Sequence, residues 1–167
     1  MGTKNELNIN IEMGWSTHMP VLIKMANLTK GPIMEIGSGI YSTPLLHWLC
    51  VETKRHLVTF ESDKDFIKLA KEYESEDHRV QFVEDYLTIP NTDRYSFIFI
   101  DHSGHSRGKT VVHFKDSADY IVIHDSNVVG KNMYQIAFPE FKYRKDYNLF
   151  IPWTTVVSNT RNLDNLW

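Results

Sequence analysis

Short apolar runs alternate along the chain with segments whose apolar residues recur at helical spacing. The runs with strand character are 33–36, 56–60, 79–83, 95–100 and 120–123. Segments 43–49 and 65–73 place apolar side chains three or four positions apart, as in an amphipathic helix, and 109–114 indicates a shorter helix. Continuous apolar strands separated by helices predict a parallel sheet covered on both faces.

The last third of the chain has a different pattern. Segments 141–150 and 153–158 are two extended runs, which predict an antiparallel pair at one edge of the sheet. We therefore expect an α/β fold with a Rossmann-like, doubly wound, seven-stranded sheet. Five strands are parallel, the C-terminal pair is antiparallel, and helices cover both faces. Ligands of such sheets bind at the carboxyl ends of the strands.

The composition is that of an ordinary folded domain. Of 167 residues, 42% are hydrophobic and 23% are charged, which excludes a disordered chain. Cys50 is the single cysteine, so a reducing, intracellular setting is favoured over a disulfide framework. The formal net charge of -3 argues against a nucleic-acid-binding face. No apolar run is long enough to span a membrane, and residues 1–11 lack a signal-peptide pattern. We expect a cytoplasmic protein.

Each predicted parallel strand ends in glycine or in an acid. In chain order these residues are Gly37 and Gly39, then Glu61, Asp85, Asp101 and Asp125. All of them fall at the edge where such a sheet binds ligands. The alternative is that loops are polar in any protein and that acids favour helix N-termini.

The segment Glu35–Gly39 is the sharpest motif. Glycines after a first strand let the backbone approach a nucleotide-like cofactor, and Glu61 at the end of the next strand can bind ribose hydroxyls. A dinucleotide fingerprint requires a third glycine, where this chain has Ser42. Tyr41 and Pro44 also crowd the place of a pyrophosphate. The pattern favours a cofactor that has a ribose but no pyrophosphate.

These motifs resemble those of class I S-adenosylmethionine (SAM)-dependent methyltransferases over residues 31–158. The resemblance implies a single methyltransferase-like domain over residues 1–167. Within it, 1–30 would be an N-terminal helical or lid segment, 31–130 the cofactor-binding core, and 131–167 a C-terminal helix with the strand pair. It also implies a set of cofactor contacts: Glu35, Gly37, Ser38, Gly39, Ser42, Glu61, Ser62, Asp85, Tyr86 and Asp101.

A narrower similarity is to catechol-type O-methyltransferases, which hold a divalent metal. It implies a Mg²⁺ site at Asp101, Asp125 and Asn127, because hard oxygen ligands suit this ion. The sequence departs from that pattern in two places. Ser126 stands where Asn would follow the second acid, and Gly104 stands in place of the lysine base.

Segment 101–109 is unusually rich in basic side chains. Its histidines suit general-base chemistry, so the catalytic candidates are His102, His105, Asp101 and, from the next strand, His124. Arg107 and Lys109 would bind a carboxylate or phosphate of the acceptor. One alternative is an ordinary solvated loop. Another is that the same His and Asp residues bind zinc or another transition metal, although no metal-specific spacing supports it. Trp15, with His18 and Met19, is either a lid over the cofactor, with Trp15 contacting the substrate, or an anchor for the first helix.

The predicted function is SAM-dependent methyl transfer, with a small-molecule or glycan hydroxyl as the default acceptor. The chain has no inserted substrate domain, which leaves room for a homodimer in which a second subunit completes the acceptor site. Two alternatives stay open. One is a non-catalytic binding protein on the same fold, and the other is an NAD(P)-dependent oxidoreductase.

Overall fold

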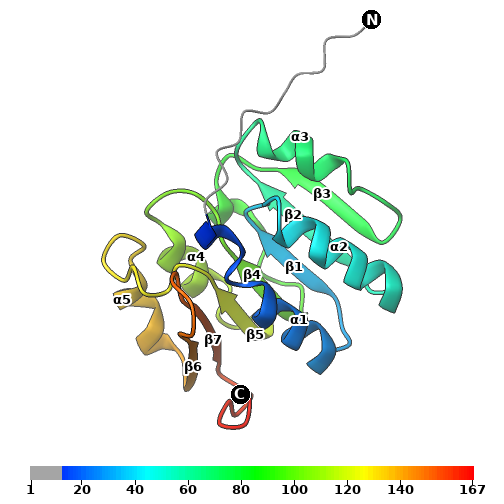
Figure 1. Cartoon of the computed structure of the whole chain (residues 1–167). Coiled ribbons are helices and arrows are strands. Elements are labelled where there is room, and N and C mark those ends of the chain that lie inside the picture. The colour runs from blue at the N-terminus through cyan, green and yellow to red at the C-terminus, as the bar shows by residue number, and fades with distance from the viewer. Residues whose placement is uncertain (1–12) are drawn as a thin grey trace, which may run out of the picture.

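A computed structural model describes residues 13–167 as one twisted sheet between two layers of helices (Figure 1). The strands are β1 (Ile33–Ile36), β2 (Leu57–Glu61), β3 (His78–Phe82), β4 (Tyr95–Ile100), β5 (Ala118–Ile123), β6 (Tyr143–Tyr147) and β7 (Thr154–Ser158). Their order in the seven-stranded sheet is β3-β2-β1-β4-β5-β7-β6. Strands β1 to β5 pair in parallel, and β7 is antiparallel to both β5 and β6. The predicted fold class is confirmed.

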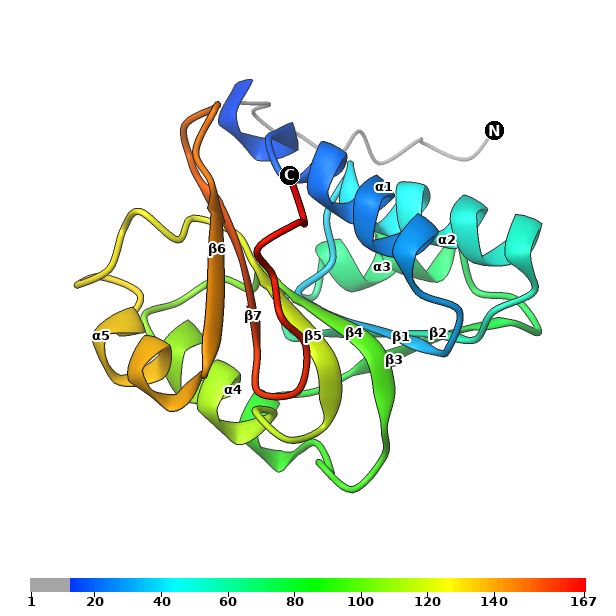
Figure 2. The same ribbon diagram turned by 90° about the horizontal axis from the view of Figure 1, so that it is seen from below.

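Helices α1 (Met19–Leu28), α2 (Ser42–Thr53) and α3 (Phe66–Lys71) lie on one face of the sheet. Helices α4 (Arg107–His113) and α5 (Tyr134–Ala137) lie on the other (Figure 2). Within residues 13–167 there are also three 3-10 helices: η1 (Met13–Ser16), η2 (Tyr86–Thr88) and η3 (Phe138–Glu140). The continuous apolar strands are explained by this sandwich, because β4 contributes Phe97 and Phe99 to one core and Ile98 and Ile100 to the other.

The chain winds in opposite directions from β1. It runs through β2 and β3 towards one edge, then crosses to β4 and β5 on the other side of β1. A crevice forms at the carboxyl ends of the strands where this reversal occurs. In the part of the chain that the structure describes, no helix has the length and apolar character needed to cross a membrane.

A chain of buried hydrogen bonds links β1, β2, β3 and α2 beneath the crevice. The Thr59 hydroxyl donates to Glu35 Oε2 at 2.8 Å, and Thr59 Oγ1 lies 2.8 Å from His78 Nε2. His78 Nδ1 lies 3.2 Å from His47 Nδ1. Burial raises the pKa of the Glu35 carboxyl to about 7. Glu35 was expected to contact a cofactor, but it is fully buried in this network, because its side chain points from β1 into the α2 layer.

Candidate functional site

A cavity of about 460 Å³ opens at the carboxyl ends of β1, β4 and β5. Its walls come from η1, from the loop after β1, from the start of α3 and from the loops after β4 and β5. Predicted site residues that line it are Trp15, Ser38, Gly39, Ser42, Glu61, Asp101, His102, Arg107, His124 and Asp125. Sequence periodicity placed Phe66 in the apolar stripe of a helix, but the residue lines this cavity as well. The volume lies within the range of roughly 300–1,000 Å³ that is usual for small-molecule sites.

The loop after β1 requires glycine at its first position. Gly37 has φ +89°, and a Cβ atom there would overlap the backbone of His102. Only glycine adopts this conformation without strain and allows such a close approach. The loop therefore lies directly against the end of β4, which narrows the crevice at the point where the strand order reverses.

Glu61 ties the loops after β1 and β2 together. Its carboxylate is 4% exposed and accepts five hydrogen bonds from protein donors. These donors are Ser38 N (2.6 Å), Ser38 Oγ (2.8 Å), Ser62 N (2.6 Å), Asp63 N (2.7 Å) and the Tyr86 hydroxyl (3.2 Å). Three are fixed backbone amides, while the two hydroxyls are free to turn to another partner. A ligand hydroxyl that reaches Glu61 must therefore replace the bond from Ser38 Oγ or from Tyr86.

Asp101 and His124 form the polar centre on the other side of the cavity. His124 Nδ1 lies 3.0 Å from Asp101 Oδ2, and His124 Nε2 lies 3.0 Å from Thr17 Oγ1. Burial raises the pKa of Asp101, but His124 and Arg107 outweigh this effect and hold it at about 2. Burial lowers the pKa of His124, but Asp101 and Asp125 outweigh this effect and raise it above its ordinary value.

Arg107 bridges the ends of β4 and β5. Its guanidinium lies 3.0 Å from Asp101 Oδ1 and 2.6 Å from Asp125 Oδ2. Asp125 has φ +51°, a left-handed conformation that aspartate tolerates better than most residues. Arg107 was expected to bind the acceptor, but its charge is already paired with these two carboxylates.

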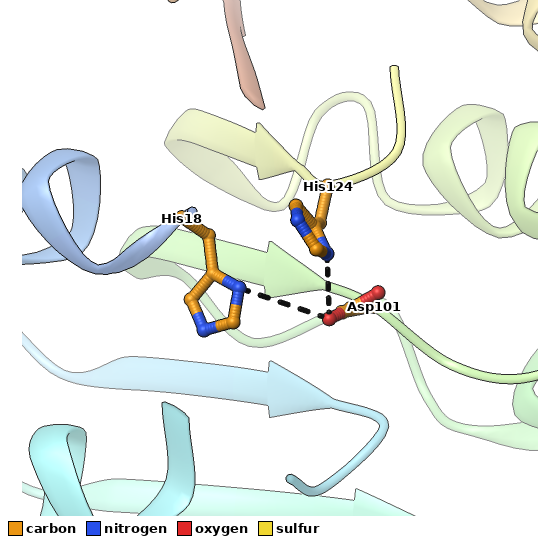
Figure 3. Close-up of side chains that lie close together, drawn as sticks. All are labelled: His18, Asp101 and His124. Carbon is orange, nitrogen blue, oxygen red and sulfur yellow. Dashed lines mark hydrogen bonds and ion pairs between the residues drawn. The ribbon is translucent and has the colours of Figure 1, made fainter. Parts of the chain in front are cut away.

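His18 completes this cluster from the N-cap position of α1. It is 2% exposed, and both of its ring nitrogens lack a hydrogen-bond partner among residues 13–167. Its Nδ1 lies 4.0 Å from Asp101 Oδ2, and its ring meets the edge of His124 (Figure 3). The His18 ring also packs against Phe99. The sequence left His18 in either a lid or an anchor for the first helix, and nothing in the spacing indicated that it meets Asp101.

Comparison with known proteins identifies the fold. No protein-family model and no curated protein sequence matches this chain. The methyltransferase PaMTH1 from Podospora anserina, bound to S-adenosylhomocysteine (SAH), matches 83% of this chain over 75% of its own chain, with a TM-score of 0.64 and 14% identity. A provisionally assigned caffeoyl-CoA O-methyltransferase from Staphylococcus aureus matches 90% and 85%, with a TM-score of 0.63 and 15% identity.

The chain has the methyltransferase fold. The N-methyltransferase NodS from Bradyrhizobium japonicum WM9 also matches, over 86% of this chain and 94% of its own, with a TM-score of 0.61 and 10% identity. The methyltransferase fold therefore carries both O- and N-methylation, and it does not by itself identify the acceptor.

Two residues expected to contact the adenine ring do not line the cavity of this methyltransferase fold. The exposed Asp85 accepts a hydrogen bond from Leu87 N at 2.9 Å and so caps η2. Tyr86 is buried and stacks on His102. Ser62 also lies outside the cavity lining, and its amide donates to Glu61.

The basic segment is divided by the fold. His102 is buried, with Nδ1 2.8 Å from Ser103 O and Nε2 2.9 Å from Thr110 Oγ1, and burial lowers its pKa to about 4. A ring whose pKa lies this low is a weak base near neutral pH, so His102 is a poorer base candidate than His124, whose pKa is raised. His105 and Lys109 are exposed and lie outside the cavity lining. Trp15 does line the cavity.

The predicted Mg²⁺ ligands come together only in part, because Asp101 and Asp125 line the cavity but Asn127 does not. Asn127 is exposed, and its Oδ1 accepts a hydrogen bond from Trp153 N at 2.9 Å. Asp101 and Asp125 both pair with Arg107. The turn after β5 directs the Asn127 side chain to the backbone of Trp153, which directly precedes β7, so Asn127 is not placed to join the two acids in the expected oxygen ligand set.

Proposed function

We propose that this protein is a SAM-dependent methyltransferase that methylates a hydroxyl of a small-molecule or glycan acceptor. The main support is the arrangement of one cavity on the methyltransferase fold. The glycine loop and Glu61 lie on one side of it, and the Asp101–His124 pair lies on the other. A cofactor and an acceptor would therefore meet between these two groups.

The residues present fit the cofactor at its methionine and ribose ends. Asp101 carries a carboxylate in the cavity, which suits the positive charges of the methionine part. Glu61 would accept the ribose hydroxyls in place of the Ser38 or Tyr86 hydroxyl. Phe66 offers a flat apolar surface for the adenine ring. When bound, SAM supplies an activated methyl group.

The acceptor end is formed by His124, Asp101, His18 and Trp15. A hydroxyl has to lose its proton as the new carbon–oxygen bond forms, and His124 and Asp101 are the side chains positioned to act on it. The rest of the catalysis is placement, because the acceptor oxygen must lie in line with the methyl group. The presence of side chains that can take up a proton favours a hydroxyl acceptor, because an amine needs less help with its proton.

A non-catalytic binding protein is the second candidate, because the Glu61 carboxylate is already saturated by protein donors. Calorimetry with SAM, SAH and NAD⁺ tests the cofactor. We expect binding of the first two and none of NAD⁺. Transfer of a labelled methyl group from SAM to a panel of phenols, sugars and amines then tests the activity. Transfer to hydroxyl compounds supports the proposal, whereas SAH binding with transfer to amines alone contradicts it.

A further inference from the structure

The cluster at the acceptor end of the cavity contains two histidines and a carboxylate from three separate elements. His18 precedes α1, Asp101 follows β4 and His124 follows β5 (Figure 3). We propose that these three residues bind one divalent transition-metal ion of the Zn²⁺ class. This site differs from the oxygen-ligand site expected from the sequence, since it shares Asp101 but neither Asp125 nor Asn127.

The candidate ligand atoms lie near the spacing that a shared ion requires. One atom from each residue lies within 4.8 Å of the other two. His124 Nδ1 is 3.0 Å from Asp101 Oδ2, and His18 Nδ1 is 4.0 Å from the same oxygen. With metal–ligand bonds of about 2.0–2.2 Å, neighbouring ligand atoms lie roughly 3–3.5 Å apart. A movement of the His18 ring by less than about 1 Å would close the site.

His18 supplies a second, independent observation. Five buried side-chain atoms of the described residues lack a hydrogen-bond partner, and two of them are the ring nitrogens of His18. Burying unpaired polar atoms is unfavourable, so such a residue needs an explanation. The contacts with Phe99 and His124 hold the ring beside Asp101. A metal ion between the three residues would give His18 the partner that the protein does not.

The groups around the cluster are those that support metal ligands. A metal-bound histidine usually donates its other ring N–H, and His124 Nε2 lies 3.0 Å from Thr17 Oγ1. The second oxygen of Asp101 pairs with Arg107 at 3.0 Å. With neutral histidines, Asp101, Asp125 and Arg107 together leave one net negative charge in a largely buried place, which favours a cation.

The ligand types select the metal. Two imidazoles with one carboxylate suit Zn²⁺, Fe²⁺ or Co²⁺, whereas Mg²⁺ prefers oxygen ligands. Three protein ligands on one wall of the cavity leave coordination positions open, as in catalytic zinc sites. An ion there would hold an acceptor oxygen and lower the pKa of its hydroxyl. That consequence rests on the proposed methyl transfer, but metal binding itself does not.

The test is a Co²⁺ titration of protein stripped with a chelator, without cofactor, followed by calorimetry and by the visible absorption of bound Co²⁺. We expect one Co²⁺ per chain, displaced by Zn²⁺ and not by Mg²⁺. His18→Phe keeps an aromatic ring against Phe99 and removes both nitrogens. It should weaken Co²⁺ binding by roughly 100-fold or more, since changes outside the direct ligands already cost 10–100-fold.

The matched control is His56→Ala, because His56 is a surface histidine (81% exposed side chain) at the opposite end of the sheet. This variant should bind Co²⁺ as the wild type does. His18→Phe should also melt at or above the temperature of the metal-free wild type, since it removes unpaired buried nitrogens. Asp101→Asn is a second variant that should lose the ion. Absence of Co²⁺ binding, or equal binding by wild type and His18→Phe, overturns the proposal.

The metal site and the methyltransferase assignment fail separately. SAH titration of the metal-free wild type tests the cofactor without the ion. Binding of Co²⁺ without SAH supports the metal site and contradicts the methyltransferase. Binding of SAH without Co²⁺ supports the methyltransferase and overturns the metal site.

Discussion

The ring of Tyr86 stacks on the ring of His102, with centroids 4.3 Å apart and an interplanar angle of 28°. The Tyr86 hydroxyl lies 3.2 Å from Glu61 Oε1, so the stack joins the loops that follow β2, β3 and β4. Both residues were expected to contact ligands, yet both are buried by each other. Tyr86 lies outside the cavity lining, whereas Trp15, Tyr41, Phe66 and His102 contribute to it.

Replacing His102 tests this packing role. His102→Ala removes the stack and two hydrogen bonds, so we expect the free energy of unfolding to fall by roughly 2–3 kcal/mol. Urea denaturation measures this change. Methyl transfer per folded molecule should change little by comparison, and a loss of 100-fold or more would show that His102 acts on the substrate.

Glu61 is expected to hold the ribose. Glu61→Gln keeps the size of the side chain but removes the charge and turns one acceptor into a donor. SAH affinity should fall roughly 10–100-fold, the usual effect of losing charge-assisted hydrogen bonds. Calorimetry gives the affinity, and Glu52→Gln, an exposed acid on α2, is the control. Equal affinity in wild type and Glu61→Gln would remove Glu61 from the cofactor site.

His124 is expected to act on the acceptor and not on the cofactor. His124→Ala should lower turnover roughly 100–10,000-fold, the range for a group that assists proton transfer. SAH affinity should stay near that of the wild type, and thermal melting would check that the variant is folded. His56→Ala provides the comparison on a surface histidine. Loss of SAH binding with turnover preserved at saturation would reassign His124 to the cofactor.

Gly37 should tolerate no side chain. Gly37→Ala combines a positive φ with an overlap of its Cβ with the His102 backbone, so the free energy of unfolding should fall by about 1–3 kcal/mol or more. Gly130→Ala is a matched control, since no atom lies within 4 Å of its added Cβ. Gly130→Ala should change the free energy of unfolding by no more than about 0.5 kcal/mol. Similar urea midpoints for the two variants would contradict the close approach of the loop to β4.

Glu35 should make stability depend on pH. Its pKa is raised to about 7 in the folded protein, so the folded state holds its proton more tightly than the unfolded chain, where 4.5 is the ordinary value. The stability that this proton contributes is fully present below pH 4.5 and is lost as pH rises through about 7.

The side chain introduced by Glu35→Gln cannot ionise, so this variant should not lose stability as pH rises through about 7. Thermal melting of both proteins at pH 5 and pH 8 measures the difference in stability between them. Groups that titrate in both proteins do not contribute to this difference. From pH 5 to pH 8, the free energy of unfolding of Glu35→Gln should rise relative to that of the wild type by roughly 2–3 kcal/mol, as the shift of the Glu35 pKa implies. A pH-independent difference would show that Glu35 is already ionised at pH 5.

Local pattern determined the strands and their order of appearance. Runs 33–36 and 95–100 were predicted with the bounds that β1 and β4 have, because a buried parallel strand is apolar on both faces wherever it lies. The glycine loop and the acids at strand ends were also readable, since parallel strands bring their carboxyl ends to one edge of the sheet. The sequence therefore determined the fold class and the edge of the sheet that carries the site.

Only the tertiary structure decided which of these side chains meet. His18 reaches Asp101 because α1 packs on the sheet beside Phe99, a contact between segments far apart in the sequence. Arg107 pairs with Asp125, whose left-handed backbone directs its carboxylate inwards, so Arg107 is not free to bind the acceptor. Periodicity shows which face of an element is buried, but the direction of a polar side chain depends on partners that long-range packing brings together. For that reason the sequence located the site and the fold determined its chemistry.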